Sequence, residues 1–391
     1  MQFLDNLFVN IGHGIRNLLG GVLPGWGVEL IMMIVAASVL TLLGVATMLY
    51  LTWLDRKFVG RFQDRLGPNR VGRFGLLQPF ADMVKMFIKE DITPDAAHRW
   101  VYNLAPILVV PPALLVLAVV PWGHELSGRD LSIGWLYIAA VASTSVFGIF
   151  MAGWGSRNKY ALLGAMRAAA QIVSYEIPQV LSVVGVLLIA GSLSMQKIVE
   201  AQNVWFIVLQ PVGFLIFLVA SLAEINRTPF DIPEAESEII AGYHTEYSGL
   251  KFGMFFLAEY ISTFAVAAIG AAMFLGGWRG PILPGWLWFA IKTFLLLFVI
   301  LWLRYTLPRF RVDQLMNFAW KVLVPLALAN LLVAGLIAWI INPAETPGFW
   351  TLIGFLMGNL ILVAATVILV VWRAPRAEKA EVSMLSAKGL P

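Results

Sequence analysis

The sequence predicts an all-α integral membrane protein with about nine transmembrane helices and further amphipathic helices at the membrane surface. Of its 391 residues, 60% are hydrophobic and only 13% are charged, whereas about one quarter of the residues of a soluble protein are charged. The apolar residues also gather in runs long enough to cross a hydrocarbon core of about 30 Å. Backbone groups in lipid must be satisfied within the segment, so we expect these runs to be helices.

The predicted spans form one polytopic membrane domain, residues 28–372, with a short segment at either end. The run at 159–190 is too long for a straight crossing at about 1.5 Å per residue. It must therefore tilt, kink or begin along the membrane surface, and Pro178 offers a kink. The apolar runs lie at 28–54, 101–121, 133–153, 159–190, 204–224, 253–277, 285–304, 319–341 and 348–372.

The two ends of the chain are predicted to lie outside the membrane domain. Residues 1–27 lack the basic start and the unbroken apolar core of a signal peptide. Apolar side chains from Leu4 to Leu19 fall on one helical face, which predicts an amphipathic helix on the outer surface. Residues 373–391 are charged and rich in small side chains, so we expect a flexible cytoplasmic tail.

The distribution of basic residues predicts the orientation of the chain. If the N-terminus lies outside, 21 of the 27 Lys and Arg residues fall on the opposite side of the membrane. The side richer in Lys and Arg is cytoplasmic. The C-terminus and the loops 55–100 and 225–252 are therefore predicted to be cytoplasmic. The exceptions are Arg16, Arg129, Lys197 and Arg279 on the outer side, and Arg167 and Lys292 within the spans.

Several classes of protein are excluded by what the chain lacks. With no cysteine, it can form no disulfide, no thiolate-held iron–sulfur cluster and no covalent c-type haem attachment. The four histidines lie outside the apolar runs, which excludes a haem held by histidines within the membrane. The formal charge of +4 is modest, and no nucleic-acid partner is expected.

The first cytoplasmic loop combines a basic stretch with an amphipathic segment. The stretch DRKFVGRFQDRLGPNRVGRFG contains a turn signal at Gly67-Pro68-Asn69. From Pro79 onward, apolar residues recur at helical spacing while Asp82 and Lys85 share the opposite face. Such a helix lies in the headgroup plane. It is either a plain surface anchor or a wall of an opening for a lipophilic substrate.

The second cytoplasmic loop is unusually acidic. Glu234 and Glu238 share a helical face, so they repel each other when both are ionised, which favours protonation of one of them. A partly protonated cluster is a candidate proton store, and the alternative is an ordinary solvated acidic loop. The acidic residues are Glu224, Asp231, Glu234, Glu236, Glu238 and Glu246.

Ionisable residues inside the apolar runs form a third group, namely Arg167, Glu176, Glu259 and Lys292. A charge at membrane depth costs about 2.5–3.5 kcal/mol or more, so these residues should face the interior and pair. One reading is a structural ion pair, for example Glu259 with Lys292. The other is a proton route, because the acids lie on different helices.

Three long motifs resemble those of a known family. The strings RLGPNRVGRFGLLQPFADMVKMFIKED, AEINRTPFDIPEAESEIIAGYHTEYSG and PRFRVDQLMNFAWK, together with SYEIP and AEY, occur in family order between about Val28 and Ala338. They are similar to the signatures of the H-type membrane subunit of bacterial NADH:quinone oxidoreductase, respiratory complex I (subunit 1 in mitochondria). The ninth span is an extension that only some members have, and Asp55 stands where most members have glutamate.

The resemblance implies a subunit of the bacterial inner membrane that docks the peripheral arm, forms much of the quinone chamber and begins a buried charge chain. Its partners would be the peripheral-arm quinone-module subunits, the adjacent small membrane subunits and lipid. Quinone would be the substrate, while NADH, FMN and the iron–sulfur clusters would belong to partner subunits. The implied chamber residues are Arg56, Arg65, Asp82, Arg227 and Arg304. The implied proton-chain residues are Glu176, Glu224, Asp231, Glu234, Glu236, Glu238, Glu246 and Glu259.

Two alternatives stay open at this point. A membrane-bound hydrogenase or a reduced-deazaflavin dehydrogenase complex contains an equivalent subunit, although the extended HTEYSG ending favours the respiratory enzyme. A free-standing cation/proton transporter would also bury acids, but the chain shows no internal repeat.

Overall fold

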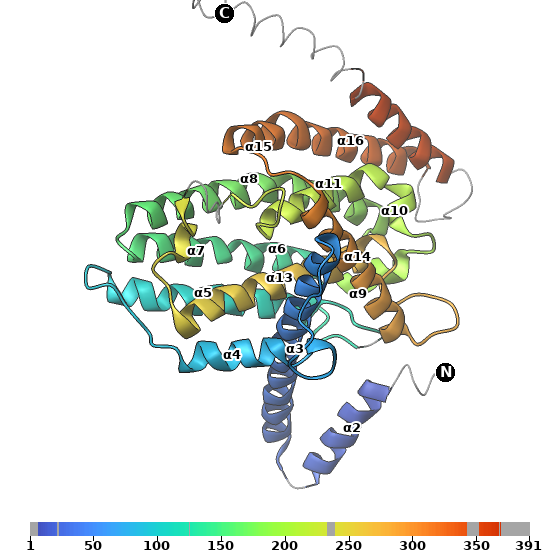
Figure 1. Ribbon diagram of the computed structural model, residues 1–391. Helices are drawn as coiled ribbons and strands as arrows, with labels where there is room; N and C mark the ends of the chain where they lie inside the picture. Colours follow the sequence, from blue (N-terminus) through green and yellow to red (C-terminus); the bar gives the residue numbers. More distant parts are fainter. Residues whose placement is uncertain are drawn as a thin grey trace, which may run out of the picture.

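The computed structural model is an assembly of helices (Figure 1). The predicted tail and Glu234, Glu236 and Glu238 lie outside the described residues. The structure describes residues 7–21, 23–124, 126–232, 239–341, 352–366 and 368.

Seven helical segments of this described part are long and apolar enough to cross a membrane, which confirms the all-α membrane class. They form because their apolar runs satisfy every backbone group internally. The segments are α3 (Gly25–Phe62), α5 (Arg99–Val119), α6 (Gly134–Ser143) with α7 (Ser145–Gly155), α8 (Lys159–Ala190), α13 (Gly249–Phe274), α14 (Gly285–Thr306), and α15 (Val312–Phe318) continued by η3 (Ala319–Leu323) and α16 (Val324–Ile341).

Two of the nine predicted spans are shorter than expected. The run at 204–224 is divided into α10 (Phe206–Leu209) and α11 (Pro211–Glu224). Hydropathy does not register this break, which falls at Gln210 because Pro211 has no N–H to continue a helix from α10. Of the run at 348–372, the described helix covers Leu352–Thr366.

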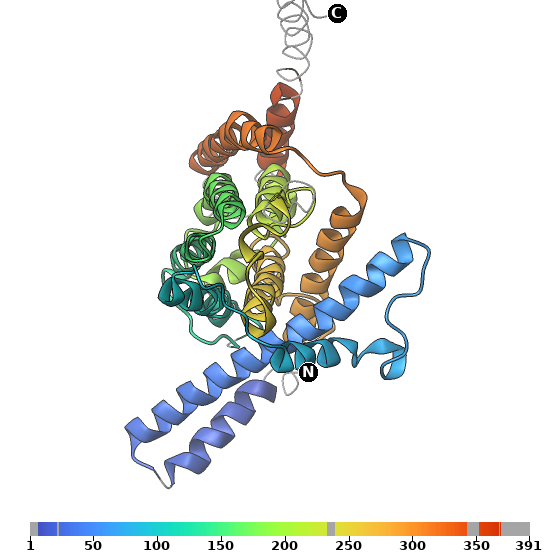
Figure 2. The ribbon, with the colours of Figure 1, turned by 60° about the vertical axis from the view of Figure 1, so that its left-hand side comes forward.

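Helix α13 occupies the centre of the bundle. It packs against α3, α5 and α14, and 67% of its apolar stretch is buried, against 6% for that of α3. A charged side chain on α13 is therefore enclosed by other helices, whereas most of α3 faces outward. Figure 2 shows the first half of α3 projecting from the bundle beside α2 (Leu7–Gly20).

The two predicted amphipathic segments are helices. Both α2 and α4 (Gln78–Ile88) expose apolar side chains, among them Leu18 and Phe87, and both have polar residues on another face. Pro79 lies in the first turn of α4, where its missing N–H costs no hydrogen bond. Their location at the two membrane surfaces remains a prediction. The remaining short helices are η1 (Arg73–Gly75), α9 (Met195–Ala201) and η2 (Gly242–His244).

Candidate functional site

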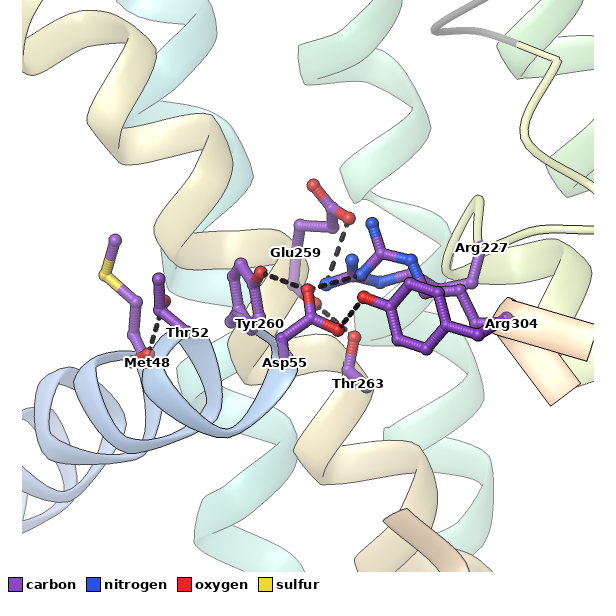
Figure 3. Close-up of polar contacts among 9 residues, drawn as sticks. Met48, Thr52, Asp55, Arg227, Glu259, Tyr260, Thr263 and Arg304 are labelled. Carbon is purple, nitrogen blue, oxygen red and sulfur yellow. Dashed lines mark hydrogen bonds and ion pairs between the residues drawn. The ribbon is translucent and has the colours of Figure 1, made fainter. Parts of the chain in front are cut away.

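Asp55, near the end of α3, anchors a group of buried polar side chains. This residue is only 7% exposed. One carboxylate oxygen, Oδ2, accepts hydrogen bonds from Arg304 Nη1 at 2.7 Å and from the Tyr260 hydroxyl at 3.0 Å (Figure 3). The other, Oδ1, accepts from the Tyr305 hydroxyl. Asp55 thus ties α3 to both α13 and α14, and its shorter side chain still makes direct contacts.

Arg227 lies in the loop after α11 and is 3% exposed. Its Nη2 is 3.1 Å from Glu259 Oε1, and its guanidinium carbon lies 4.6 Å from the centre of the Tyr260 ring. Burial alone would lower the pKa of Arg227, but Glu259, Tyr260 and Asp55 together outweigh burial and the pKa is raised. The arginine therefore stays charged inside the protein.

The two ion pairs share Tyr260, so they form one unit. We call it the buried charge cluster, and Figure 3 shows its side chains meeting between helices. In a poorly solvated interior, charges a few ångströms apart interact much more strongly than in water. A change at one ion pair is therefore transmitted to the other. The cluster consists of Asp55, Arg227, Glu259, Tyr260, Arg304 and Tyr305.

The backbone around Arg227 is held by a glutamine from α8. The Gln171 Nε2 donates to the carbonyl oxygens of Ala223 and Phe230, both at 2.7 Å. Asn226 adopts a left-handed conformation with φ of 52°, which turns the chain sharply after α11. Together these features direct Arg227 back into the bundle.

A second group of polar residues lines a cavity of about 80 Å³ that Glu176 and Glu224 both reach. Gln179 Nε2 donates to Glu224 Oε2 at 2.6 Å and to Ser221 Oγ at 3.1 Å. The Ser143 hydroxyl, at the junction of α6 and α7, donates to Glu176. Two carboxylates, one from α8 and one from α11, thus reach one small cavity whose remaining lining is mostly apolar and comes largely from α5, α6 and α13.

The cavity lies next to the buried charge cluster on α13. Ser262 lines the cavity, and Glu259 precedes it by three residues, so both occupy the same face of that helix. Helix α13 thus contributes side chains to both the cluster and the cavity. Acidic groups of this kind can bind and release protons in sequence.

The other predicted chamber residues lie on α3, in the loop after it and on α4. Arg56 Nη1 is 2.5 Å from Asp82 Oδ2, and this ion pair links α3 to α4. Arg65 donates from Nε to Gln63 Oε1 at 2.7 Å in an exposed loop. Arg227 and Arg304 both belong to the buried charge cluster, whereas the described contact of Arg65 is local.

Two other acids of the second loop have different surroundings. Asn158 Nδ2 donates to Glu246 Oε1 at 2.7 Å, next to the stacked rings of Tyr102 and Tyr247. This contact fastens the end of the loop to α8. Asp231 is half-buried, four residues after Arg227.

The suggested pairing of Glu259 with Lys292 is wrong. Lys292 donates to the carbonyl oxygens of Gly277 at 2.9 Å and Arg279 at 2.6 Å. Because α13 and α14 are consecutive and antiparallel, Lys292 lies near the turn that joins them. Glu259 is further from this turn and meets Arg227 instead.

Sequence reasoning missed three polar partners. Gln179 could have been found, because it follows Glu176 by three residues and so shares its helical face. Tyr260 and Tyr305 give no such signal, since tyrosines are common in apolar spans. In the described part of the chain, no group of three or more acidic or histidine residues could hold a metal ion.

Comparisons with known proteins agree with the motifs. The family model described as NADH dehydrogenase matches residues 33–335. The NADH-quinone oxidoreductase H subunit of Dehalococcoides mccartyi is 56% identical over 307 residues, which cover 78% of this chain and 87% of the relative. The same subunit of Anoxybacillus flavithermus is 50% identical over 321 residues, 80% and 96% of the two chains. That of Bacillus thuringiensis subsp. konkukian is 52% identical over 290 residues, 72% and 87%.

Proposed function

Because the chain belongs to the NADH dehydrogenase family, we propose that it forms part of the quinone chamber of an NADH-quinone oxidoreductase and begins the charge chain that couples quinone reduction to proton pumping. It acts as a multi-pass subunit of the bacterial inner membrane. The observation that carries this proposal is the buried charge cluster and its proximity to the cavity that Glu176 and Glu224 reach.

The surroundings of α4 support the chamber. This helix packs against both α3 and α13. The Arg56–Asp82 ion pair also links it to α3. Phe80 and Phe87 are largely exposed apolar side chains on α4. An isoprenoid tail needs such an apolar wall on its way from the membrane to a polar headgroup site. Redox cofactors and the groups that bind the headgroup would then come largely from partner subunits.

The geometry of the cluster supports the coupling. A change of charge in the chamber alters the field at Asp55 and Arg304, which lie at the cytoplasmic ends of their helices. Tyr260 and Arg227 pass this change to Glu259. A carboxyl in such a place can take up or release a proton in response. Glu224 and Glu176 extend the same path on α11 and α8.

Changing Arg227 to Ala in the assembled complex tests the proposal. We expect NADH:quinone reduction to fall at least about a hundredfold, because removing one partner of a buried ion pair costs about 3–5 kcal/mol and roughly 1.4 kcal/mol corresponds to each factor of ten. Electron transfer from NADH to a soluble acceptor should remain, since that chemistry belongs to partner chains. The matched control is Arg99→Ala, which removes an exposed arginine at the start of α5.

The amount of assembled complex must be measured in parallel. Loss of both activities in a fully assembled Arg227→Ala complex would contradict a role in the quinone site. Mass spectrometry of the purified complex also tests the assignment. A hydrogenase module or a deazaflavin-binding subunit in place of an NADH-oxidising arm would identify one of the related complexes.

A further inference from the structure

A larger cavity, of about 430 Å³, lies on the flank of α3 that faces α14. Phe58, one of its lining residues, packs edge-on against Phe298 of α14 with ring centres 5.3 Å apart. Arg56, which pairs with α4, does not line this cavity. None of the five residues implied for the quinone chamber lines this cavity. Its lining consists of Trp53, Leu54, Lys57, Phe58, Arg61, Phe62, Phe74 and Leu76.

The loop after α3 is shaped to place Phe74 over this cavity. Phe74 has a φ of 58°, a left-handed conformation that costs a non-glycine residue energy. Its carbonyl accepts a hydrogen bond from Trp53 Nε1 at 3.1 Å. Gly75 follows with φ of 78°, and a Cβ there would lie 2.2 Å from the Pro68 carbonyl oxygen. Strain of this kind persists where the surrounding structure demands it, and it often marks a binding site.

Two cations, Lys57 and Arg61, line the cavity, and a third, Arg73, lies against the ring of Phe74. Lys57 and Arg61 are four residues apart and so share one face of α3. The guanidinium carbon of Arg73 lies 5.5 Å from the centre of the Phe74 ring. None of the three forms an ion pair with a carboxylate of the described residues. The site thus combines a pocket of aromatic rings with uncompensated positive charge.

We propose that this cavity binds an acidic phospholipid. Its volume lies within the usual range of ligand pockets, about 300–1,000 Å³. An acyl chain would pack against Phe58, Phe62 and Phe74, and the phosphate would lie between Lys57 and Arg61. Tryptophan and basic residues mark the level of the lipid headgroups, which places the site where such a lipid is available.

The chemistry of the lining favours this ligand over others. A quinone headgroup is neutral and would leave the positive charges of the lining without an anion. Free phosphate is anionic but would leave the four aromatic rings without an apolar partner. A zwitterionic lipid carries a positive group that would lie close to Lys57 or Arg61 and be repelled. Only a ligand with both an anionic head and an apolar chain matches the whole cavity.

Photocrosslinking in vesicles that contain the assembled complex tests the proposal. The probe is phosphatidylglycerol with a photoreactive group in one acyl chain, and labelled peptides are identified by mass spectrometry. We expect labelling of the segment 53–76, removed by excess unlabelled phosphatidylglycerol but not by phosphatidylcholine, a short-chain quinone or glycerol phosphate. Equal competition by phosphatidylcholine, or loss of labelling with the quinone, would overturn the proposal.

The double variant Lys57→Gln, Arg61→Gln should reduce specific labelling at least about fivefold, because each basic residue near the membrane adds attraction for anionic lipid. The matched control is the double variant Lys85→Gln, Lys89→Gln. These two exposed lysines have the same four-residue spacing, with Lys85 in the last turn of α4 and Lys89 directly after it. It should label like the unmodified protein. Equal labelling of the two double variants would show that charge at the cavity does not select the lipid.

A photoreactive amino acid at position 58 covers the case in which the double variant fails to assemble. It should crosslink to phospholipid extracted with the complex. Crosslinking to another protein subunit instead would show that a protein fills the cavity and would overturn the proposal. Because the test reports binding, it is independent of quinone reduction and proton pumping.

Discussion

Tyr260 joins two ion pairs that come from four different parts of the chain. Its hydroxyl donates to Asp55 Oδ2 at 3.0 Å, and its ring lies 4.6 Å from the guanidinium carbon of Arg227. The hydroxyl contacts Asp55 and also forms a side-chain hydrogen bond with Arg227, whereas the ring contacts only Arg227 of these two. Removing the hydroxyl and then the whole ring therefore weakens the link between the ion pairs in two steps.

The change Tyr260→Phe keeps the ring over Arg227 and removes the hydroxyl that donates to Asp55. Such a bond contributes about 0.5–1.5 kcal/mol, or up to about 3 to a charged group. We expect quinone-linked turnover of the assembled complex to fall by about three- to thirtyfold. Tyr260→Leu removes the ring as well and should lower turnover further. If Tyr260→Phe and Tyr260→Leu both match the unmodified enzyme, Tyr260 does not link the ion pairs.

Asp55→Asn should destabilise the subunit. It leaves Arg304 without its carboxylate in a place that is largely buried, and breaking such a pair costs about 3–5 kcal/mol. We expect a lower thermal midpoint and less assembled complex, measured by native electrophoresis of solubilised membranes.

Asp55→Glu is the matched control, since it restores the residue of most family members and keeps the charge. It should assemble normally. Full stability of Asp55→Asn would show that Arg304 does not depend on this carboxylate.

Glu259→Gln and Glu176→Gln should each lower quinone-linked turnover at normal assembly. Glutamine keeps the size and hydrogen bonding of glutamate but cannot release a proton. Binding of a quinone-site inhibitor should change little. The measurement is proton uptake together with NADH oxidation in vesicles. Wild-type rates and proton yields in both variants would make these carboxylates structural. Glu29→Gln, on the exposed start of α3, is the control.

Single cysteines can report the orientation, because the chain has none of its own. Cysteines at Asn69 and Ser248 should react with a membrane-impermeant reagent only from the cytoplasm, and one at Ser127 only from outside. The expectation depends on the positive-inside rule. Cytoplasmic labelling of the Ser127→Cys variant alone would overturn the predicted topology.

The sequence by itself determined the class of fold and most helix positions. A hydrophobic run in lipid must become a helix, so composition alone places α5, α8 and α14 close to their observed bounds. The break at Gln210 was missed, because a hydropathy average over many residues hides the effect of a single residue. The motifs also identified Arg227, Arg304 and Glu259 as candidates.

Only the tertiary structure decided which charges meet. A buried charge needs a partner, and the sequence indicates this need but does not show which residue is the partner. Glu259 could have paired with Lys292, yet the antiparallel arrangement of α13 and α14 moves Lys292 toward the turn between them. The turn after α11 then brings Arg227 into the space beside Glu259 and Tyr260. Contacts between residues distant in the chain depend on how whole helices pack, and no local sequence pattern predicts that packing.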